Sequence, residues 1–387
     1  MMQISPEIQL FIREHSSDDV RVLALQAKKY PDIDMPTVIT QIAGRKVAAE
    51  KIPSWWEIEK IWYPKHLSLE QCSSEITARY KARLLQGDSL TDLTGGFGID
   101  CSFLATGFKS ATYVERQEEL CEIAAHNFPV LNLNHINIKN EDGVTYLQAM
   151  SPVDCLFLDP ARRNEHGGKT VAISDCEPNV AELEELLLQK ANRVMIKLSP
   201  MLDLSLALKE LKQTQEVHIL SVNNECKELL ILLGQTSPAE ISIHCVNLFT
   251  KGTQKEQHFV FTREQEQCSE CTYTDSLETY LYEPNASLLK AGAFRSIAAA
   301  YPVRKLHPNS HLYTSDTFIE NFPGRIFRIV NQCSFNKKEV KENLADLKKA
   351  NVTVRNFPAT VAELRKRIHL AEGGDTYLFA STLNNGQ

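Results

Sequence analysis

The chain has 387 residues, of which 43% are hydrophobic and 24% are charged, a composition typical of globular proteins with two or three domains. No run of residues approaches the roughly eighteen uninterrupted apolar positions that a membrane span requires, and Met1 to Glu14 lack the apolar segment of a signal peptide. The ten cysteines are scattered along the sequence, so we expect a cytoplasmic protein with reduced thiols and no membrane partner.

Residues 1–85 show the spacing of apolar residues that is typical of short helices. Apolar positions recur at Val20, Leu23 and Leu25, and prolines separate one short helix from the next. The last helix of this region is predicted from Leu69 to Lys81.

Strands and helices alternate from residue 89 to residue 199, which predicts a doubly wound parallel sheet. The predicted strands are 89–93, 111–115, 135–139, 153–159 and 193–198. The predicted helices are 99–106, 117–128, 144–150 and 178–190, the last with Pro178 in its first turn. Two further runs, 217–222 and 228–233, predict an antiparallel pair at the edge of this sheet.

A second hairpin is predicted from the runs 241–248 and 258–262, and the pattern past residue 275 is that of a small α+β fold. The strands predicted there are 280–285, 326–330 and 376–380, and the helices are 288–297, 339–349 and 361–370.

Charge is distributed unevenly along the chain, whose net charge is −7. Residues 289–387 carry 15 Lys and Arg against 8 Asp and Glu, a net charge of +7, whereas the remainder carries 27 against 41, a net charge of −14. A basic C-terminal part favours an anionic partner such as RNA. The alternative is a solvated helical surface of mixed sign.

The most informative segment is the turn after the first predicted strand, where Asp92 leads into Thr94-Gly95-Gly96-Phe97-Gly98. Glycines let the chain turn sharply and let a ligand approach the backbone, and the helix that follows directs its N–H groups at the turn. Asp100 lies in the first turn of that helix. A glycine turn of this kind also occurs for packing alone.

Three more acidic residues follow successive strands at the same edge, where ligands bind in open α/β sheets. Glu115 lies seventeen residues past Gly98, a position suited to accepting hydrogen bonds from ribose hydroxyls. Asp142 follows the third strand and could accept from an adenine amino group. Asp159 follows the fourth strand in the segment Asp159-Pro160-Ala161-Arg162. Each of these acids also has a structural explanation as a helix cap or a turn residue.

A nicotinamide dinucleotide is the competing ligand for the glycine turn. Its fingerprint needs a third glycine three residues after the second. With Gly96 and Gly98 as the first two glycines, that position is Cys101. The turn therefore departs from the dinucleotide fingerprint, and such an enzyme gives no reason for the Asp-Pro-Ala-Arg segment.

Cys268 and Cys271 form a single CxxC pair. A structural zinc site needs about four ligands, and the nearest further candidates, His244 and His258, are irregularly spaced. We therefore predict no metal and treat the pair as part of an ordinary loop.

The segments Asp92–Gly98 and Asp159–Arg162, together with Glu115 and Asp142, resemble the class I S-adenosylmethionine-dependent methyltransferases. Further segments resemble the bacterial members that carry a THUMP-like C-terminal domain, namely 70–75, 197–200, 280–284, 291–292 and 361–367. The resemblance implies an α/β fold with a seven-stranded Rossmann-like sheet, an antiparallel edge pair, a helical N-terminal region and small α+β C-terminal domains.

Four domains follow from the resemblance. Residues 1–85 would form the helical N-terminal domain and residues 86–236 the S-adenosylmethionine-binding core. Residues 237–318 would form a hairpin extension with a small ferredoxin-like domain, and residues 319–387 the THUMP-like domain.

The resemblance also implies a role for each site residue, with S-adenosylmethionine as the cofactor. The residues implied for the methionine and ribose portions are Asp92, Thr94, Gly95, Gly96, Phe97, Gly98 and Asp100. Glu115 would hold the ribose hydroxyls and Asp142 would lie beside the adenine. The residues implied to face the methyl acceptor are Asp159, Pro160, Ala161 and Arg162, with Lys197 and Ser199 as substrate-binding candidates. The alternative for Lys197 is a structural ion pair with Glu177 or Asp175.

Two positions depart from the pattern of this family. Thr94 stands where most members have their first glycine, and Ala161-Arg162 replaces the proline-aromatic pair that is common in amino-group methyltransferases. Because the aromatic residue stacks on a target base, Arg162 would have to stack through its guanidinium plane or bind phosphate instead.

The chemistry of the acceptor separates two mechanisms. An amino acceptor needs a hydrogen-bond acceptor beside it, for which Asp159 is the candidate. A C5-pyrimidine acceptor needs a thiolate nucleophile. Cys155 is expected in the core, and Cys176 is expected to be better exposed but is the weaker candidate.

Three functions remain open from the sequence. The first is methylation of a nucleotide in structured RNA (tRNA or rRNA), with residues 319–387 as the docking module. The second is a catalytically silent RNA-binding protein, which the Ala161-Arg162 departure suggests. The third is a methyltransferase for a protein or a small molecule.

Overall fold

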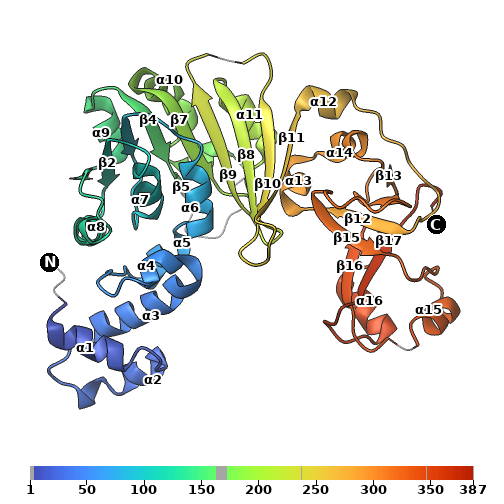
Figure 1. Cartoon of the computed structure of the whole chain (residues 1–387), viewed down its shortest axis with the longest axis horizontal. Coiled ribbons are helices and arrows are strands. Elements are labelled where there is room, and N and C mark those ends of the chain that lie inside the picture. The colour runs from blue at the N-terminus through green and yellow to red at the C-terminus, as the bar shows by residue number, and fades with distance from the viewer. Residues whose placement is uncertain (1–3, 163–171, 237, 346, 387) are drawn as a thin grey trace. The chain divides into compact units, whose positions relative to one another are not determined.

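The structure is a computed structural model that describes residues 4–162, 172–236, 238–345 and 347–386. The chain divides into two compact units (Figure 1). The first unit comprises Met1–Val217 and Glu228–Ala239, and the second comprises His218–Lys227 and Glu240–Gln387. Within the described ranges, no helix has the length and apolar character needed to cross a membrane.

The first unit opens with short helices, as the apolar spacing predicts. They are α1 (Pro6–Glu14), α2 (Val20–Leu25), η1 (Ala27–Lys29), α3 (Met35–Lys51), α4 (Pro53–Trp56), α5 (His66–Gln71) and α6 (Glu75–Ala82). Side-chain oxygens of Ser5, Asp19 and Asp34 accept backbone N–H groups at the starts of α1, α2 and α3. The buried residues of the outer helices are Phe11, Leu23, Met35, Val38 and Ile42.

Val20, Leu23 and Leu25 lie in one helix, as predicted, although the Leu25 side chain is 87% exposed. One expectation for this region is wrong. The helix predicted from Leu69 to Lys81 is two helices, because α5 ends at Gln71 and α6 begins only at Glu75. The backbone between them is extended, and Ser73 in this break is buried.

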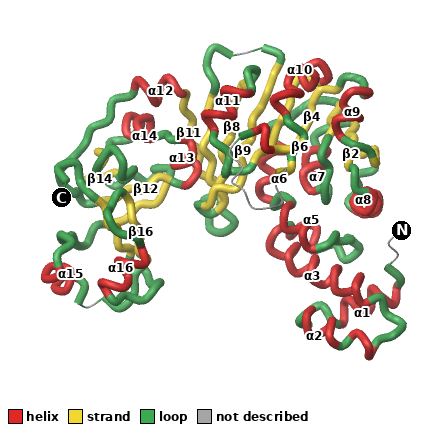
Figure 2. The backbone as a smooth tube through the Cα atoms, turned by 180° about the vertical axis from the view of Figure 1, so that it is seen from behind, coloured by secondary structure: helices red, strands yellow, loops and turns green. Residues whose placement is uncertain are grey.

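Within the described residues, the sheet that begins in the first unit has nine strands in the order β3-β2-β1-β4-β7-β9-β8-β10-β11, of which the last two are Ser242–Leu248 and Glu256–Thr262. Figure 2 shows strands in yellow and helices in red. Its parallel strands are β1 (Ser89–Asp92), β2 (Ser110–Glu115), β3 (Ile136–Asn140), β4 (Val153–Leu158) and β7 (Ala191–Leu198). β9 (Glu225–Gly234) pairs antiparallel with β7, and β8 (Thr214–Val222) lies beside β9. The five parallel strands and the antiparallel pair β8-β9 are as predicted. The prediction of seven strands with this pair at the edge is wrong, because β10 and β11 continue the sheet beyond β8.

The central strands are buried, as expected for parallel strands covered on both faces. Leu156 of β4 and Val194 and Ile196 of β7 are fully buried. The connecting helices are α7 (Ile99–Ala105), α8 (Glu118–Val130), α9 (Gly143–Ala149), α10 (Val180–Lys190) and α11 (Leu204–Glu210). Pro178 is not in the first turn of α10: Asn179 caps this helix, and Pro178 precedes the cap.

Short elements follow β4. β5 (Ala161–Arg162) pairs antiparallel with β6 (Cys176–Glu177), and η2 (Ile173–Asp175) precedes β6. Because β1, β2, β3, β4 and β7 are parallel, their carboxyl ends and the residues that follow them lie at one edge of the sheet.

The second unit contains the tip of the β8–β9 hairpin and everything from residue 240 onward. Asn223 and Asn224 both have positive φ, as a two-residue hairpin turn of this hand requires. β10 (Ser242–Leu248) and β11 (Glu256–Thr262) form the predicted second hairpin, and α12 (Arg263–Cys268) follows.

The remainder of the second unit holds two small sheets. One has the order β13-β14-β12-β15 and the other is the parallel pair β16-β17. The strands are β12 (Tyr280–Pro284), β13 (Arg304–Lys305), β14 (Tyr313–Ser315), β15 (Gly324–Arg328), β16 (Asn351–Arg355) and β17 (Tyr377–Ser381). The helices are α13 (Ala286–Ala291), α14 (Phe294–Ala300), α15 (Lys337–Asn343) and α16 (Val361–Ile368). The single helix predicted over 288–297 is split at Gly292, whose positive φ ends α13.

Candidate functional site

The glycine turn after β1 is built on the ring of Tyr113. Gly96 and Gly98 have φ values of +54° and +87°, a region that favours glycine. A Cβ on Gly95 would lie 2.2 Å from the Tyr113 ring, so only glycine fits there. The Tyr113 hydroxyl donates to the Gly96 carbonyl at 2.5 Å. Sequence reasoning gave Tyr113 no role, because a buried aromatic residue in a strand is indistinguishable from ordinary core.

Phe97 belongs to the same turn, but its side chain lies in the core. Its ring packs against Trp55 and Tyr63 of the N-terminal region, at centroid distances of 5.2 and 6.3 Å. A cofactor in this turn would therefore meet the Phe97 backbone, while the ring anchors the turn to the N-terminal helices.

Asp92 ends β1 and is buried. Its Oδ1 accepts the Thr94 N–H at 3.0 Å, and its Oδ2 has no hydrogen-bond partner among the described residues. Burial raises the pKa of Asp92 to about 8, the Thr94 N–H opposes the shift, and the nearby carboxylates Asp100, Asp159 and Glu115 add to it. An unpartnered buried carboxyl of this kind suits a cationic ligand.

Thr94, the departure from the family pattern, joins two loops. Its hydroxyl accepts the backbone N–H of Asp159 at 2.6 Å and lies 3.5 Å from Asp92 Oδ1. The threonine side chain thus ties the turn after β1 to the segment after β4, a contact that glycine could not make.

Glu115 reaches the glycine turn from the end of β2. Its Oε2 accepts the Gly96 N–H at 2.9 Å, and its Oε1 accepts the Gln117 N–H at 2.8 Å. Each carboxylate oxygen can accept more than one hydrogen bond, so Glu115 retains capacity for further donors.

Asp142 lies at the rim of this group. It is exposed and caps α9, accepting the N–H groups of Val144 and Thr145 at 3.0 Å each. Gly143 lets the start of α9 lie close to the glycine turn, because a Cβ on Gly143 would lie 2.2 Å from the Leu93 carbonyl oxygen. The loop after β3 therefore packs on the loop after β1.

Asp159 and Lys197 form an ion pair at the ends of β4 and β7. Burial raises the pKa of Asp159 while Lys197 opposes the shift. Burial would lower the pKa of Lys197, but Asp159, Asp100 and Glu228 hold it above its usual value, so Lys197 stays charged. The alternative pairing of Lys197 with Glu177 is wrong, since Glu177 lies 3.4 Å from Arg116.

Four buried residues that sequence reasoning did not combine lie behind this pair. Lys81 of α6 contacts Asp100 Oδ1 at 2.8 Å and Glu228 Oε2 at 2.7 Å. Ser73 donates to Asp100 Oδ2 at 2.6 Å, and the ammonium groups of Lys81 and Lys197 lie 2.8 and 3.1 Å from its hydroxyl. Lys81 on an amphipathic helix looks like part of a solvated face, so no sequence signal identified it.

The remaining predicted residues flank the pair. Pro160 is buried and Ala161 is exposed, while Arg162 lies in β5. Ser199 accepts the Met201 N–H at 3.3 Å in a local turn. Substrate binding by these residues stays a prediction.

Both cysteines considered as nucleophiles are buried. Cys155 is 1% exposed, which confirms its place in the core. Cys176 is 2% exposed, so the expectation that it is better exposed is wrong.

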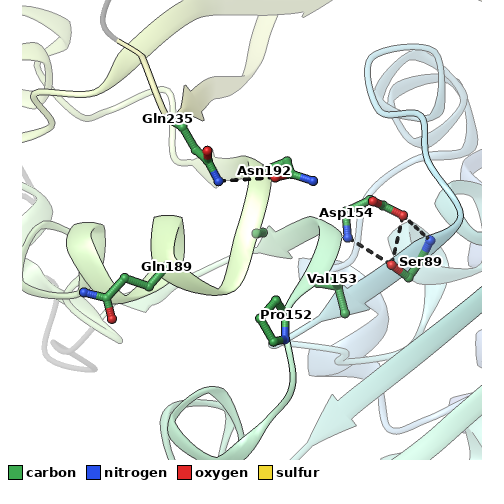
Figure 3. A pocket seen from close by; sticks show the side chains of 8 residues that line it. Ser89, Pro152, Val153, Asp154, Gln189, Asn192 and Gln235 are labelled. Carbon is green, nitrogen blue, oxygen red and sulfur yellow. Dashed lines mark hydrogen bonds between the residues drawn. The ribbon is translucent and has the colours of Figure 1, made fainter.

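Two shallow pockets lie away from this group. The pocket in Figure 3 is at the amino ends of β1, β4 and β7, opposite the glycine turn. There Asp154 accepts from the N–H and hydroxyl of Ser89, and Gln235 donates to Asn192 at 3.2 Å (Figure 3). These polar groups satisfy one another. A second pocket is lined by the segment 268–273 and by Arg295, and Cys268 there is exposed.

The cluster of site residues at the carboxyl ends of the parallel strands has more acidic than basic members. Its acidic members are Asp92, Asp100, Glu115, Asp159 and Glu228, and its basic members are Lys81 and Lys197. This surplus of acid favours a ligand that carries positive charge, beside a turn whose glycines admit the ligand to the backbone.

Comparisons with known proteins cover the whole chain. A family model for a ferredoxin-like domain matches residues 280–323, and a THUMP domain-like model matches residues 324–387. A solved structure of a candidate methyltransferase from Porphyromonas gingivalis W83 is 35% identical with a TM-score of 0.87, over 98% of this chain and 95% of that chain. No curated protein is a significant match.

Other solved structures match parts of the chain. A modification subunit of a candidate type I restriction enzyme from Vibrio vulnificus YJ016 is 12% identical with a TM-score of 0.36, over 52% of this chain and 56% of that chain. A candidate methyltransferase from Streptococcus mutans, in complex with SAH, is 13% identical with a TM-score of 0.30, over 41% of this chain and 96% of that chain.

Proposed function

We propose that this chain, which belongs to the family of the Porphyromonas gingivalis candidate methyltransferase and has a THUMP-like C-terminal domain, is a class I S-adenosylmethionine-dependent methyltransferase that methylates a nucleotide in structured RNA. The observation that carries the proposal is the meeting of Asp92, the glycine turn, Glu115 and Asp159 at one edge of the sheet. Each of these groups follows a parallel strand, where open α/β sheets bind their ligands.

The residues present fit S-adenosylmethionine. The unpartnered Oδ2 of buried Asp92 and the acid surplus around it suit a ligand with an ammonium and a sulfonium group. Asp92 and the turn Thr94–Gly98 would hold the methionine portion, Glu115 the ribose hydroxyls and Asp142 the adenine. When bound, the cofactor supplies an activated methyl group, so the protein has only to align the acceptor and exclude water.

Asp159 is the proposed catalytic residue. Its carboxylate would accept a hydrogen bond from the acceptor N–H and so aim the nitrogen lone pair at the methyl group. The N–H proton would pass to an Asp159 oxygen and then to solvent as the N–C bond forms. Lys197 is held in its charged form beside Asp159, so Lys197 is not a general base.

The state of the thiols argues against a carbon acceptor. Methylation at pyrimidine C5 needs a thiolate. Burial raises the pKa of Cys72 and of Cys155 to about 11, and it raises that of Cys101 well above its usual value. A nitrogen acceptor therefore fits the site better than a carbon one.

The basic C-terminal part supports RNA as the substrate. Residues 289–387 carry a net charge of +7 in a chain whose net charge is −7. Arg365, Lys366 and Arg367 lie together in the last turn of α16, and the Arg367 guanidinium lies 4.1 Å from the centre of the Phe335 ring. Basic groups beside an aromatic ring suit a phosphate backbone with accessible bases.

The direct test compares modified nucleosides in tRNA and rRNA from cells with and without this protein. We expect one methylated nucleoside to be lost in the deletion strain, restored by the wild-type gene and not by Asp159→Asn. Restoration by Asp159→Asn would support the silent RNA-binding alternative. An unchanged nucleoside profile would favour a protein or small-molecule substrate.

A further inference from the structure

The break between α5 and α6 brings the N-terminal helices into contact with the acceptor side of the site. Resting on the function proposed above, we propose that Ser73 and Lys81 are positioning residues, which hold Lys197 and through it the Asp159 carboxylate. The N-terminal region is then part of the methyl-transfer machinery, in addition to any role in binding substrate.

Ser73 uses its full hydrogen-bonding capacity inside this network. A serine hydroxyl has one donor and two acceptor sites. The Ser73 hydroxyl donates to Asp100 Oδ2 at 2.6 Å and accepts from Lys81 and Lys197 at 2.8 and 3.1 Å. Its orientation is therefore fixed from three directions. This contact needs the break between the two helices, in which Cys72 and Ser74 on either side of Ser73 are extended, since a continuous helix would carry the side chain elsewhere.

Lys81 and Lys197 are both held by several partners. Lys81 is fully buried, donates to Ser73 at 2.8 Å and to Glu228 at 2.7 Å, and forms an ion pair with Asp100 at 2.8 Å. Lys197 directs its three N–H groups at Asp159, Asp100 and Ser73, the Asp100 contact being 3.5 Å. Each ammonium group therefore contacts Ser73 and two carboxyl groups. A displacement of Ser73 therefore changes the position of Lys197, and with it the carboxylate that Lys197 binds.

A second contact joins the N-terminal region to the glycine turn, where the cofactor is proposed to bind. Phe97 of the glycine turn packs on Trp55 of α4 and on Tyr63, which lies between α4 and α5. Asp100, one turn further along, is the residue that Ser73 and Lys81 hold. The N-terminal region therefore contacts both Asp100 beside the glycine turn and Lys197 beside Asp159.

The kinetic test uses the full-length chain with Ser73→Ala and, as its matched control, the neighbouring Ser74→Ala, whose hydroxyl lies 3.2 Å from Thr77 outside the network. With labelled S-adenosylmethionine and total RNA from a deletion strain, we expect Ser73→Ala to lower kcat about tenfold or more and to change the cofactor Kd less than about threefold. Ser74→Ala should leave both kcat and the cofactor Kd unchanged. An unchanged kcat in Ser73→Ala, or equal losses of kcat in Ser73→Ala and Ser74→Ala, would overturn the positioning role.

A measurement independent of activity separates this proposal from the proposed function. Buried ammonium groups exchange slowly, so the ¹⁵N-lysine signals of Lys81 and Lys197 should be observable by NMR and assignable through Lys81→Arg and Lys197→Arg. We expect Ser73→Ala to shift the Lys197 signal, Asp159→Asn to shift the Lys81 signal, and Ser74→Ala to shift neither. Unmoved signals in the first two variants refute the coupling. Should the wild type transfer no methyl group to RNA, the proposed function fails and the NMR result alone decides the coupling.

Discussion

Asp92 is the residue at which cofactor binding should depend most strongly on pH. Its pKa is about 8 because the carboxyl is buried, so at pH 7 it holds a proton. A cationic ligand favours the ionised carboxylate. We therefore expect binding of S-adenosylmethionine at pH 7 to release close to one proton, and binding above about pH 9 to release almost none. Calorimetry in two buffers of different ionisation enthalpy measures this, and binding enthalpies that do not depend on the buffer would contradict it.

The same carboxyl affects stability with a definite sign. Native Asp92 keeps a proton up to about pH 8, whereas an unfolded Asp loses it near its ordinary value of 3.8. The folded state therefore binds more protons between these values, and stability falls as the pH rises from about 4 to about 8. Asp92→Asn removes this loss. We expect the variant to have a higher Tm than the wild type at pH 8 while binding the cofactor poorly. A Tm at or below that of the wild type would show that Asp92 is not destabilising.

Gly95 tests the steric design of the turn. A Cβ there meets the Tyr113 ring at 2.2 Å, whereas a Cβ on Gly107 would find only the Leu104 carbonyl at 3.7 Å. Gly95→Ala should therefore weaken cofactor binding about tenfold or more and cost about 1–3 kcal/mol of stability. Gly107→Ala is the matched control and should leave cofactor binding unchanged in the same titration. Comparable losses in both variants would refute a specific role for Gly95.

The sequence predicts site residues at the ends of strands more readily than the buried polar residues that contact them. Asp92, Glu115 and Asp159 follow apolar runs, and topology alone brings such positions to one edge of a parallel sheet. Ser73 and Lys81 gave no such signal, because contacts between distant segments create their roles. A buried lysine and an exposed one look alike in a helical pattern.

At the scale of elements, most predicted strands and helices lie within a few residues of the observed ones. The errors have local causes. The helix over Leu69–Lys81 is broken because Ser73 turns into the charged network, and the helix over 288–297 is split by Gly292. Strands β13 and β14 were not predicted, being two and three residues long. Hydrophobic periodicity identifies neither a break made by a buried polar contact nor a strand of that length.

A buried ion pair of Glu283 in the second unit leads to a prediction about stability. This buried carboxylate in β12 pairs with Arg325 of β15 and, at 2.8 Å, with Arg355 of β16. It thus joins the segment matched by the ferredoxin-like model to the one matched by the THUMP-like model. Because Glu283→Gln leaves two guanidinium groups without their counter-charge, we expect a loss of about 3 kcal/mol, seen as a lower Tm.

The control for Glu283 is the exposed pair Asp88 and Lys109, whose charged atoms lie 2.9 Å apart. Exposed ion pairs contribute little, so Asp88→Asn should leave the Tm unchanged. An equal fall of Tm in both variants would mean that burial does not distinguish the two pairs.

At the scale of the whole molecule, the proposed cofactor site and the proposed RNA-binding part carry opposite charge. The first unit gathers carboxyl groups around a glycine turn, while the basic residues concentrate in the last hundred residues. An RNA contact made by the basic part should weaken with salt, whereas cofactor binding in the acidic site should depend on salt much less. Measuring both affinities at about 50 and 200 mM salt tests this, and equal salt dependence would contradict it.

The central claim is methyl transfer to RNA that depends on Asp159. Its most direct test incubates purified full-length protein with labelled S-adenosylmethionine and total RNA from cells that lack this protein. We predict that the wild type labels RNA, while Asp159→Asn binds the cofactor with similar affinity and labels none. A wild-type protein that binds the cofactor yet leaves the RNA unlabelled, or an Asp159→Asn variant that labels it as fast as the wild type, would contradict the claim.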